Sequence, residues 1–268
     1  MDADRGGTPA RISSGIPFLH SYAGSVVLGL GAVGLALVVW QILVLSSKVP
    51  AYLLPAPHSV AHEWWLLVES GVLWHHVSAT LQEALLGFAL AFVASATIAY
   101  PLAKSRVVAS ILSPYIAATQ AMPILALAPL LVVWFGLGLF SKTLICALIV
   151  FFPILINTSV GLRTVDHTLI EAAQTEGANA FRVLWQIEVP LALRTILTGV
   201  KMGLTLSLTG AIVAEFVAAD SGLGYLMTLA RSQYDSSLLF VACLTVVTLA
   251  VAGYALISAL ERVLITWD

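Results

Sequence analysis

Long apolar runs separated by short polar stretches make up most of this chain of 268 residues. An α-helix needs about 20 predominantly apolar residues to cross a membrane. Six runs reach that length, namely 22–45, 77–102, 107–135, 142–162, 191–213 and 238–260. We therefore predict an all-α integral membrane protein with about six transmembrane helices, a polar tail at 1–21 and a membrane domain at 22–268.

The third run contains three prolines, Pro114, Pro123 and Pro129. A proline breaks the helical hydrogen-bond ladder, and membranes tolerate such breaks where they face protein or a water-filled cavity. We predict one long, broken span over 107–135. Dividing the region 107–162 into three spans instead would place the charged stretch that follows it outside the cell.

Composition supports the membrane class, because 60% of the residues are hydrophobic and 10% are charged. Soluble domains average about 45–50% apolar and about 25% charged residues. The spans leave no room for a soluble second domain, and without a basic run nucleic acid is not an expected partner. Cys146 and Cys243 lie inside apolar runs, so we expect packing thiols without a disulfide or metal role.

The stretch between the first two runs is rich in proline and tryptophan, which suits a membrane–water interface. We predict that it lies outside, with a surface helix near 60–68. Its residues His62, Glu63, His75 and His76 do not have the spacing of a known ligand signature, so we expect no metal site.

Basic residues give the orientation, since lysine and arginine favour cytoplasmic flanks. With both termini cytoplasmic, nine of the twelve basic residues lie in or next to the cytoplasm: Arg5, Arg11, Lys104, Arg106, Arg163, Arg182, Arg194, Lys201 and Arg262. The other three, Lys48, Lys142 and Arg231, then lie outside. This arrangement predicts cytoplasmic N and C termini and a cytoplasmic segment 163–190.

Segment 163–190 is unusually charged for this chain, and its centre has the signals of a short helix. Asp166 can cap the helix at its start, and Gly177 suits a left-handed stop. A second helix is expected over about 178–187, with apolar Phe181 and Trp185 available for burial. Two short helices on a cytoplasmic loop have the form of a docking element.

The same segment resembles the EAA loop of binding-protein-dependent ABC importer permeases. The resemblance rests on Glu171-Ala172-Ala173, Gly177 after three residues, Ile187 after nine more, and Val189-Pro190. Val189 stands where the family has leucine, and Glu176 stands where it often has leucine.

Further motifs extend the resemblance over nearly the whole chain and are similar to the nitrate/sulfonate/taurine branch of the family. They are Leu53-Leu54-Pro55-Ala56-Pro57, Met122-Pro123-Ile124, Trp134-Phe135-Gly136, Ser141-Lys142, Phe151-Phe152-Pro153, Asn157-Thr158, Val165-Asp166 and Gly222-Leu223-Gly224.

The resemblance implies a type I ABC importer permease of MetI-like architecture in the bacterial inner membrane. It implies two ATPase subunits that bind ATP and Mg, a second copy of this chain or a close homologue, and an external solute-binding protein. We name residues 163–190 the coupling segment, because in this family the loop transmits ATPase closure to the spans. The implied ATPase-coupling residues are Glu171, Ala172, Ala173, Gly177, Ile187 and Pro190.

Polar residues within the apolar runs are costly in lipid, so we expect them to face protein or water. Candidates for a translocation path or gate are Gln120, Met122, Asn157, Ser207 and Glu215. Hydrogen bonding between helices is an equal alternative for such groups. Glu83 and Lys201 stand near run ends, where snorkelling to the interface is an alternative to burial.

Catalytic motifs are absent from the sequence, which has neither a phosphate-binding Gly-x-x-x-x-Gly-Lys-Ser/Thr loop nor a Gly-x-Ser-x-Gly elbow. We expect no catalytic residue, no metal and no cofactor on this chain. A self-sufficient secondary transporter or channel is the alternative of another class, although it leaves the coupling segment without a role.

The resemblance points to two classes of solute. The branch resemblance favours a sulfonate, taurine or nitrate. The same branch includes permeases for pyrimidine vitamin precursors and aromatic acids, and no mid-span basic residue offers itself to an anion, which leaves a neutral heterocycle open.

Overall fold

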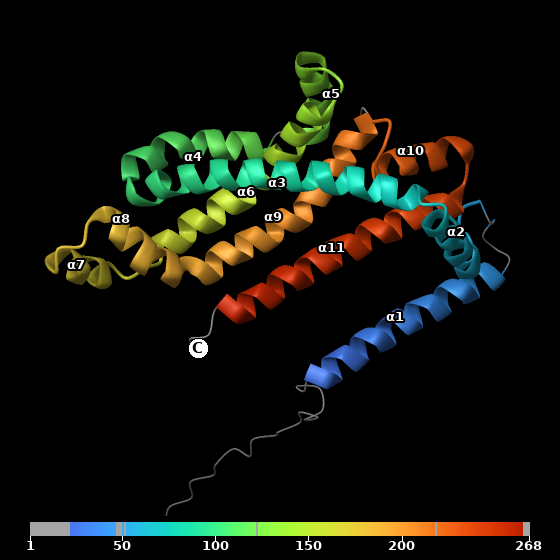
Figure 1. Cartoon of the computed structure of the whole chain (residues 1–268), viewed down its shortest axis with the longest axis horizontal. Helices are drawn as coiled ribbons and strands as arrows, with labels where there is room; N and C mark the ends of the chain where they lie inside the picture. The colour runs from blue at the N-terminus through green and yellow to red at the C-terminus, as the bar shows by residue number, and fades with distance from the viewer. Residues whose placement is uncertain (1–21, 47–49, 51, 122, 218, 265–268) are drawn as a thin grey trace, which may run out of the picture. The chain divides into compact units, whose positions relative to one another are not determined.

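The computed structural model describes residues 22–46, 50, 52–121, 123–217 and 219–264 (Figure 1). All the regular structure among these residues is helical. The elements are α1 Tyr22–Leu45, α2 Pro57–Glu69, α3 Val72–Lys104, α4 Arg106–Ala121, α5 Ile124–Phe135, α6 Leu139–Arg163, α7 His167–Thr175, α8 Ala180–Val183, the π-turn η2 Leu184–Glu188, α9 Val189–Val217, α10 Leu223–Gln233 and α11 Ser236–Leu264. The chain divides into two compact units, 1–58 and 59–268.

The first unit contains α1, an apolar helix of 24 residues. At 1.5 Å per residue it is about 36 Å long, which exceeds the roughly 30 Å hydrocarbon core of a bilayer. Trp40 Nε1 donates a hydrogen bond to Pro55 O at 3.0 Å, which fixes the chain after the helix. Most long apolar side chains of α1 from Val33 to Leu45 are exposed, whereas Trp40 and Val44 are half-buried.

In the second unit, α6 packs along both α3 and α9 (Figure 1). Small residues allow these helices to approach closely. A Cβ atom at Gly87 or Gly210 would collide with Cys146, which is fully buried. Cys146 is therefore a packing thiol as expected, whereas Cys243 is exposed, contrary to expectation.

Four stretches are long and apolar enough to cross a membrane, judged by length and composition of the described residues: Val72–Lys104, Leu139–Arg163, Ala180–Val217 and Ser236–Val263. Gly31–Leu45, Arg106–Ala118 and Ile124–Phe135 are shorter apolar helices. The range 107–135 thus holds two helices, α4 and α5, and Pro123 immediately precedes α5. The fold is an all-helical one with four to seven candidate spans, and the number that cross stays a prediction.

Three expectations about element boundaries are wrong. Helix α3 begins at Val72, so His75 and His76 belong to it rather than to a preceding interfacial stretch. The run expected over 191–213 ends later than predicted, because α9 continues to Val217, and a further helix, α10, precedes the run expected over 238–260.

The third correction concerns the second helix of the coupling segment, which continues into α9 without a break. The two are joined through η2, where the Val189 amide donates to Leu184 O, five residues back. Pro190 explains this turn, because proline has no amide hydrogen and its ring disturbs the regular ladder before it. Ala180–Val217 is therefore one continuous helical stretch.

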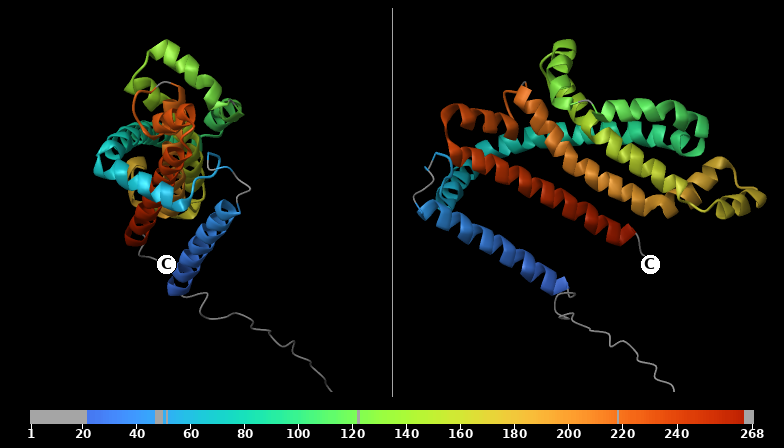
Figure 2. Two further views of the ribbon diagram at one scale, coloured as in Figure 1. Left: turned by 90° about the vertical axis from the view of Figure 1, so that its right-hand side faces the viewer. Right: turned by 180° about the vertical axis from the view of Figure 1, so that it is seen from behind.

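The two ends of this second unit carry different elements (Figures 1 and 2). Helices α7 and α8 lie together at the end where α3 finishes. Helix α10 lies at the opposite end, where α3 begins. Helix α3 therefore runs between the coupling segment and the region around α10.

Candidate functional site

The coupling segment begins with a capped helix. The Thr168 amide donates to Asp166 Oδ1 at 2.9 Å, so the Asp166 side chain satisfies a free amide at the start of α7. This hydrogen bond to the carboxylate lowers the pKa of Asp166. Asp166 therefore acts as the helix cap that its position in the sequence predicts.

Helix α7 ends in a Schellman motif at Gly177, whose φ is +87°. The Gly177 amide donates to Gln174 O and the Ala178 amide to Ala173 O, both at 3.0 Å. Asn179 then caps α8 by accepting from the Arg182 amide at 2.9 Å. Caps at three successive helix ends define the path of the chain from α7 into α8.

One face of the coupling segment packs against the bundle. Ile170 and Val183 are buried in a cluster with Leu162, Val165 and Ala192. Tyr100 and Ala103 from the end of α3 pack against the same cluster. The short helices are therefore fixed to the ends of α3, α6 and α9.

The opposite face exposes apolar side chains. Phe181 is 70% exposed and Trp185 57%, and their ring centroids lie 6.2 Å apart. Leu169 on α7 is 48% exposed. The sequence reasoning expected Phe181 and Trp185 to be buried, and within this chain they are not.

The predicted coupling residues divide between these faces. Glu171, Ala172 and Gly177 are exposed, whereas Ala173, Ile187 and Pro190 are half-buried. Apart from its two chain neighbours, no described residue has an atom within 4 Å of a Cβ built at Gly177, so the glycine borders open space. Their role in coupling stays a prediction.

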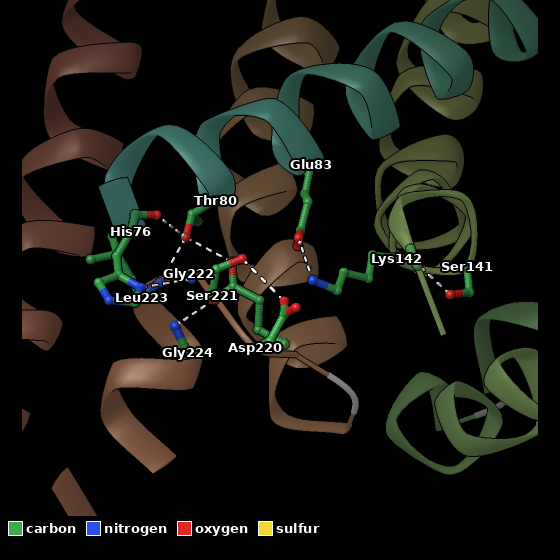
Figure 3. Close-up of polar contacts among 12 residues, drawn as sticks. His76, Thr80, Glu83, Ser141, Lys142, Asp220, Ser221, Gly222, Leu223 and Gly224 are labelled. Carbon is green, nitrogen blue, oxygen red and sulfur yellow. Dashed lines mark hydrogen bonds and ion pairs between the residues drawn. The ribbon is translucent and has the colours of Figure 1, made fainter. Parts of the chain in front are cut away.

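A buried ion pair lies at the other end of the bundle (Figure 3). Lys142 Nζ on α6 lies 2.7 Å from Glu83 Oε1 on α3. Their side chains are 8% and 4% exposed, so each charge is neutralised inside the protein. Snorkelling was an open alternative for Glu83, and the structure decides against it.

Glu215 organises the turn that leads into α10. Its carboxylate accepts a hydrogen bond from Thr80 Oγ1 at 2.7 Å and another from the Gly224 amide. The Thr80 oxygen in turn accepts from the Leu223 amide at 2.8 Å. Glu215 is 2% exposed, so it holds helices α3, α9 and α10 together rather than facing solvent in this chain.

One further hydrogen bond completes this site, which we call the polar cluster: His76, Thr80, Glu83, Lys142, Glu215 and the turn 222–224. The Gly222 amide donates to His76 Nδ1 at 3.0 Å (Figure 3). Gly222 has φ +111°, and a Cβ there would overlap the Glu215 carboxylate. From the sequence, Glu215 is a gate candidate and Gly222-Leu223-Gly224 a separate motif. The sequence contains no signal that pairs them with Thr80 or His76.

Two further path candidates, Asn157 and Ser207, bond to carbonyls of their own helices. Asn157 Nδ2 donates to Pro153 O at 2.8 Å, and the buried Ser207 donates to Leu204 O at 2.8 Å. Gln120 lies at the end of α4, its side chain outside the described residues, and Met122 lies entirely outside them. A path role for these residues stays a prediction.

Lys201 lies within α9 and pairs with Glu261 of α11, and its ammonium sits 5.5 Å from the centre of the Tyr254 ring. Among the described residues, no group of three or more His, Cys, Asp or Glu side chains has the arrangement of a metal site.

A bundle of long apolar helices with short helices packed at one end is typical of a multi-span membrane protein. Residues 85–266 match the family of binding-protein-dependent transport system inner membrane components. The chain belongs to this family of ABC transporter permeases. It is accordingly a multi-pass inner-membrane protein and not a catalytic subunit, and an ATPase and a binding protein are its implied partners.

The names of similar proteins refer to different solutes. The chain is 47% identical over 234 residues to the riboflavin transport system permease RibX of Chloroflexus aurantiacus, covering 87% of each chain. It is 32% identical to the formylaminopyrimidine permease ThiX of Halalkalibacterium halodurans, covering 86% of this chain and 92% of the relative. It is also 32% identical to the putative aliphatic sulfonate permease SsuC of Escherichia coli, covering 86% and 88%.

A solved structure confirms the fold. The chain superposes on the inward-facing MetNI methionine ABC transporter with a TM-score of 0.65 at 19% identity, covering 75% of this chain and 96% of that one. The MetI-type architecture is therefore correct. The alternative of a self-sufficient carrier or channel is overturned by the family membership.

Proposed function

We propose that this chain is the translocation subunit of an ATP-driven importer for riboflavin or a related nitrogen heterocycle. Two copies, or one copy and a close homologue, form the membrane part. Two ATPase subunits bind ATP and Mg on the cytoplasmic side, and a binding protein delivers the solute outside. The 47% identity to a riboflavin permease over 87% of both chains is the observation that carries the choice of solute.

Similarity to the sulfonate and taurine permeases is lower, at 32% and 30% identity. The charges inside the bundle also favour a neutral solute. Lys142 begins one predicted span and Lys201 lies in the middle of another, contrary to the expectation that no basic residue is mid-span, and a glutamate neutralises each of them. An oxyanion would have to compete with those carboxylates, whereas an uncharged heterocycle needs hydrogen bonds and apolar contacts only.

Six helices cross the membrane in this proposal, with both termini cytoplasmic. They are α1, α3, the pair α4–α5, α6, α9 and α11. The coupling segment then faces the cytoplasm, and α10 with the polar cluster lies toward the outside.

The ATPase docks on the exposed face of the coupling segment. Glu171, Ala172 and Gly177 lie at this surface, and Phe181 offers an exposed aromatic anchor of the kind found at interface centres. Packing of Ile170 against the bundle lets a push on α7 reach the membrane helices.

Uptake by cells tests the solute. A strain lacking this chain should lose energy-dependent uptake of labelled riboflavin, and the wild-type gene should restore it. Uptake of labelled taurine in the same cells is the control and should not change. Loss of taurine uptake with intact riboflavin uptake would replace the heterocycle by a sulfonate.

A further inference from the structure

Both ends of the coupling segment are tied to the last turn of one helix, α3. Arg163, before α7, donates from Nη2 to Leu102 O, one of the carbonyls that a helix end leaves without a partner. Glu188, at the end of η2, accepts from Lys104 Nζ. The two attachment points on α3 are two residues apart, so both ends of the coupling segment are held at the same place on α3.

The contact between Glu188 and Lys104 neutralises a buried carboxylate. The Glu188 side chain is 2% exposed, whereas that of Lys104 is 31% exposed. The second carboxylate oxygen of Glu188 has no hydrogen-bond partner among the described residues. A buried carboxylate is strongly disfavoured without a cation, so separating Glu188 from Lys104 when the segment moves would cost free energy.

Glu188 also lies at the joint between the docking helices and α9. Residues Leu184–Glu188 form the π-turn, and Pro190 follows at once. The proline and the π-turn interrupt the regular helical hydrogen bonds there. Movement of α8 is therefore transmitted to α9 less rigidly than along a regular helix. The ion pair bypasses this joint and connects the segment directly to α3.

Helix α3 leads from this tie to the polar cluster. It is 33 residues long, about 50 Å, and continuous from Val72 to Lys104. His76, Thr80 and Glu83 lie at its other end. A displacement of Lys104 therefore acts on the helix that holds the turn before α10.

We infer that Lys104 and Glu188 are positioning residues that transmit movement of the docked ATPase to α3, and through α3 to the polar cluster. The inference rests on the proposed docking of the ATPase at the coupling segment. In this inference, the ion pair between η2 and α3 is the direct path of coupling. The path through Pro190 into α9 is less direct.

The test uses the complete complex of permease, ATPase and binding protein in liposomes, with riboflavin as the solute probe. The variants are Lys104→Met, Glu188→Gln and the charge exchange of Lys104→Glu with Glu188→Lys. Lys201→Met is the matched control, because it breaks an ion pair between α9 and α11 that does not touch the coupling segment. Two quantities are measured: ATPase recovered with the permease, and solute transported per ATP hydrolysed.

We expect each single variant to retain the ATPase and to lower transport per ATP by about tenfold, while the charge exchange restores it. Lys201→Met should keep the wild-type ratio. An unchanged ratio in assembled Lys104→Met, or a charge exchange that stays uncoupled, would overturn the inference. If the single variants do not retain the ATPase, the transport per ATP of the charge-exchange variant decides. A wild-type ratio supports the inference, and a lowered ratio overturns it. A wild-type permease that recovers no ATPase, or transports no riboflavin, contradicts the proposed function instead.

Discussion

The polar cluster and the coupling segment lie at opposite ends of α3 and differ in how far their polar groups depend on partners from other helices. In the polar cluster, Glu83, Lys142 and Glu215 are buried and find partners on other helices. In the coupling segment, Asp166 and Asn179 are exposed and bond to amides two or three residues away. The first region depends on the assembled bundle, whereas the second combines local helix caps with ties to α3 at Arg163 and Glu188.

This difference matches the proposed roles. A surface that binds an ATPase needs a defined shape before the partner arrives, and local caps provide it. A region that opens and closes with transport needs contacts between helices that can be exchanged. Substitutions at the two ends should therefore affect different properties.

The largest effect on stability is expected at the Glu83–Lys142 pair. Lys142→Met leaves the Glu83 carboxylate buried without a cation, which should cost about 3 kcal/mol of unfolding free energy. Unfolding by SDS in mixed micelles measures the loss. The double variant Lys142→Met with Glu83→Leu should recover most of it, and equal losses in the single and double variants would contradict the ion pair.

Two glycines with positive φ give a matched comparison of the two regions. Gly222→Ala strains the backbone and meets the Glu215 carboxylate, so it should destabilise the protein by about 2 kcal/mol. Gly177→Ala has the same backbone strain but open space around it, and should cost about 1 kcal/mol. The same unfolding assay compares them, and an equal or reversed order would contradict the packing at Gly222.

An aromatic residue of the coupling segment should affect binding without affecting stability. Phe181→Ser removes an exposed ring and should weaken ATPase binding by about 2 kcal/mol, roughly 30-fold in Kd. Titration of purified ATPase onto the permease in nanodiscs measures the affinity. Tyr234→Ser is the control, because Tyr234 is 83% exposed after α10 and should leave the affinity unchanged.

The smallest effect concerns the Asp166 cap and appears with pH. The folded pKa of Asp166 lies below its ordinary value, so the ionised cap stabilises α7 above that ordinary value. This stabilisation falls as the pH drops through the lowered folded pKa. Hydrogen exchange at α7, corrected for intrinsic rates, should quicken over that window in the wild type but not in Asp166→Asn. The same pH dependence of exchange in the wild type and in Asp166→Asn would show that the carboxylate charge does not stabilise the cap.

Local signals made the coupling segment predictable. Asp166 as a cap and Gly177 as a left-handed stop follow from short-range backbone chemistry, and the structure has both. The continuation of α8 into α9 was missed, because a proline such as Pro190 more often marks a boundary than a π-turn within one helix.

Contacts between distant residues made the polar cluster unpredictable. Thr80 and Glu215 are 135 positions apart, and Glu83 and Lys142 are 59 apart. A single sequence contains no signal that pairs them. It predicts that polar groups inside spans need partners, and only the packing of α3, α6 and α9 identifies which ones.

Recovery of the ATPase with the purified permease tests the central claim, docking at the coupling segment, most directly. Gly177→Trp places a bulky ring at the open, positive-φ glycine after α7, and Gly71→Trp does the same at the opposite end of α3. We predict that Gly177→Trp loses the ATPase while Gly71→Trp keeps it at the wild-type amount. Full recovery of the ATPase with Gly177→Trp would contradict the account.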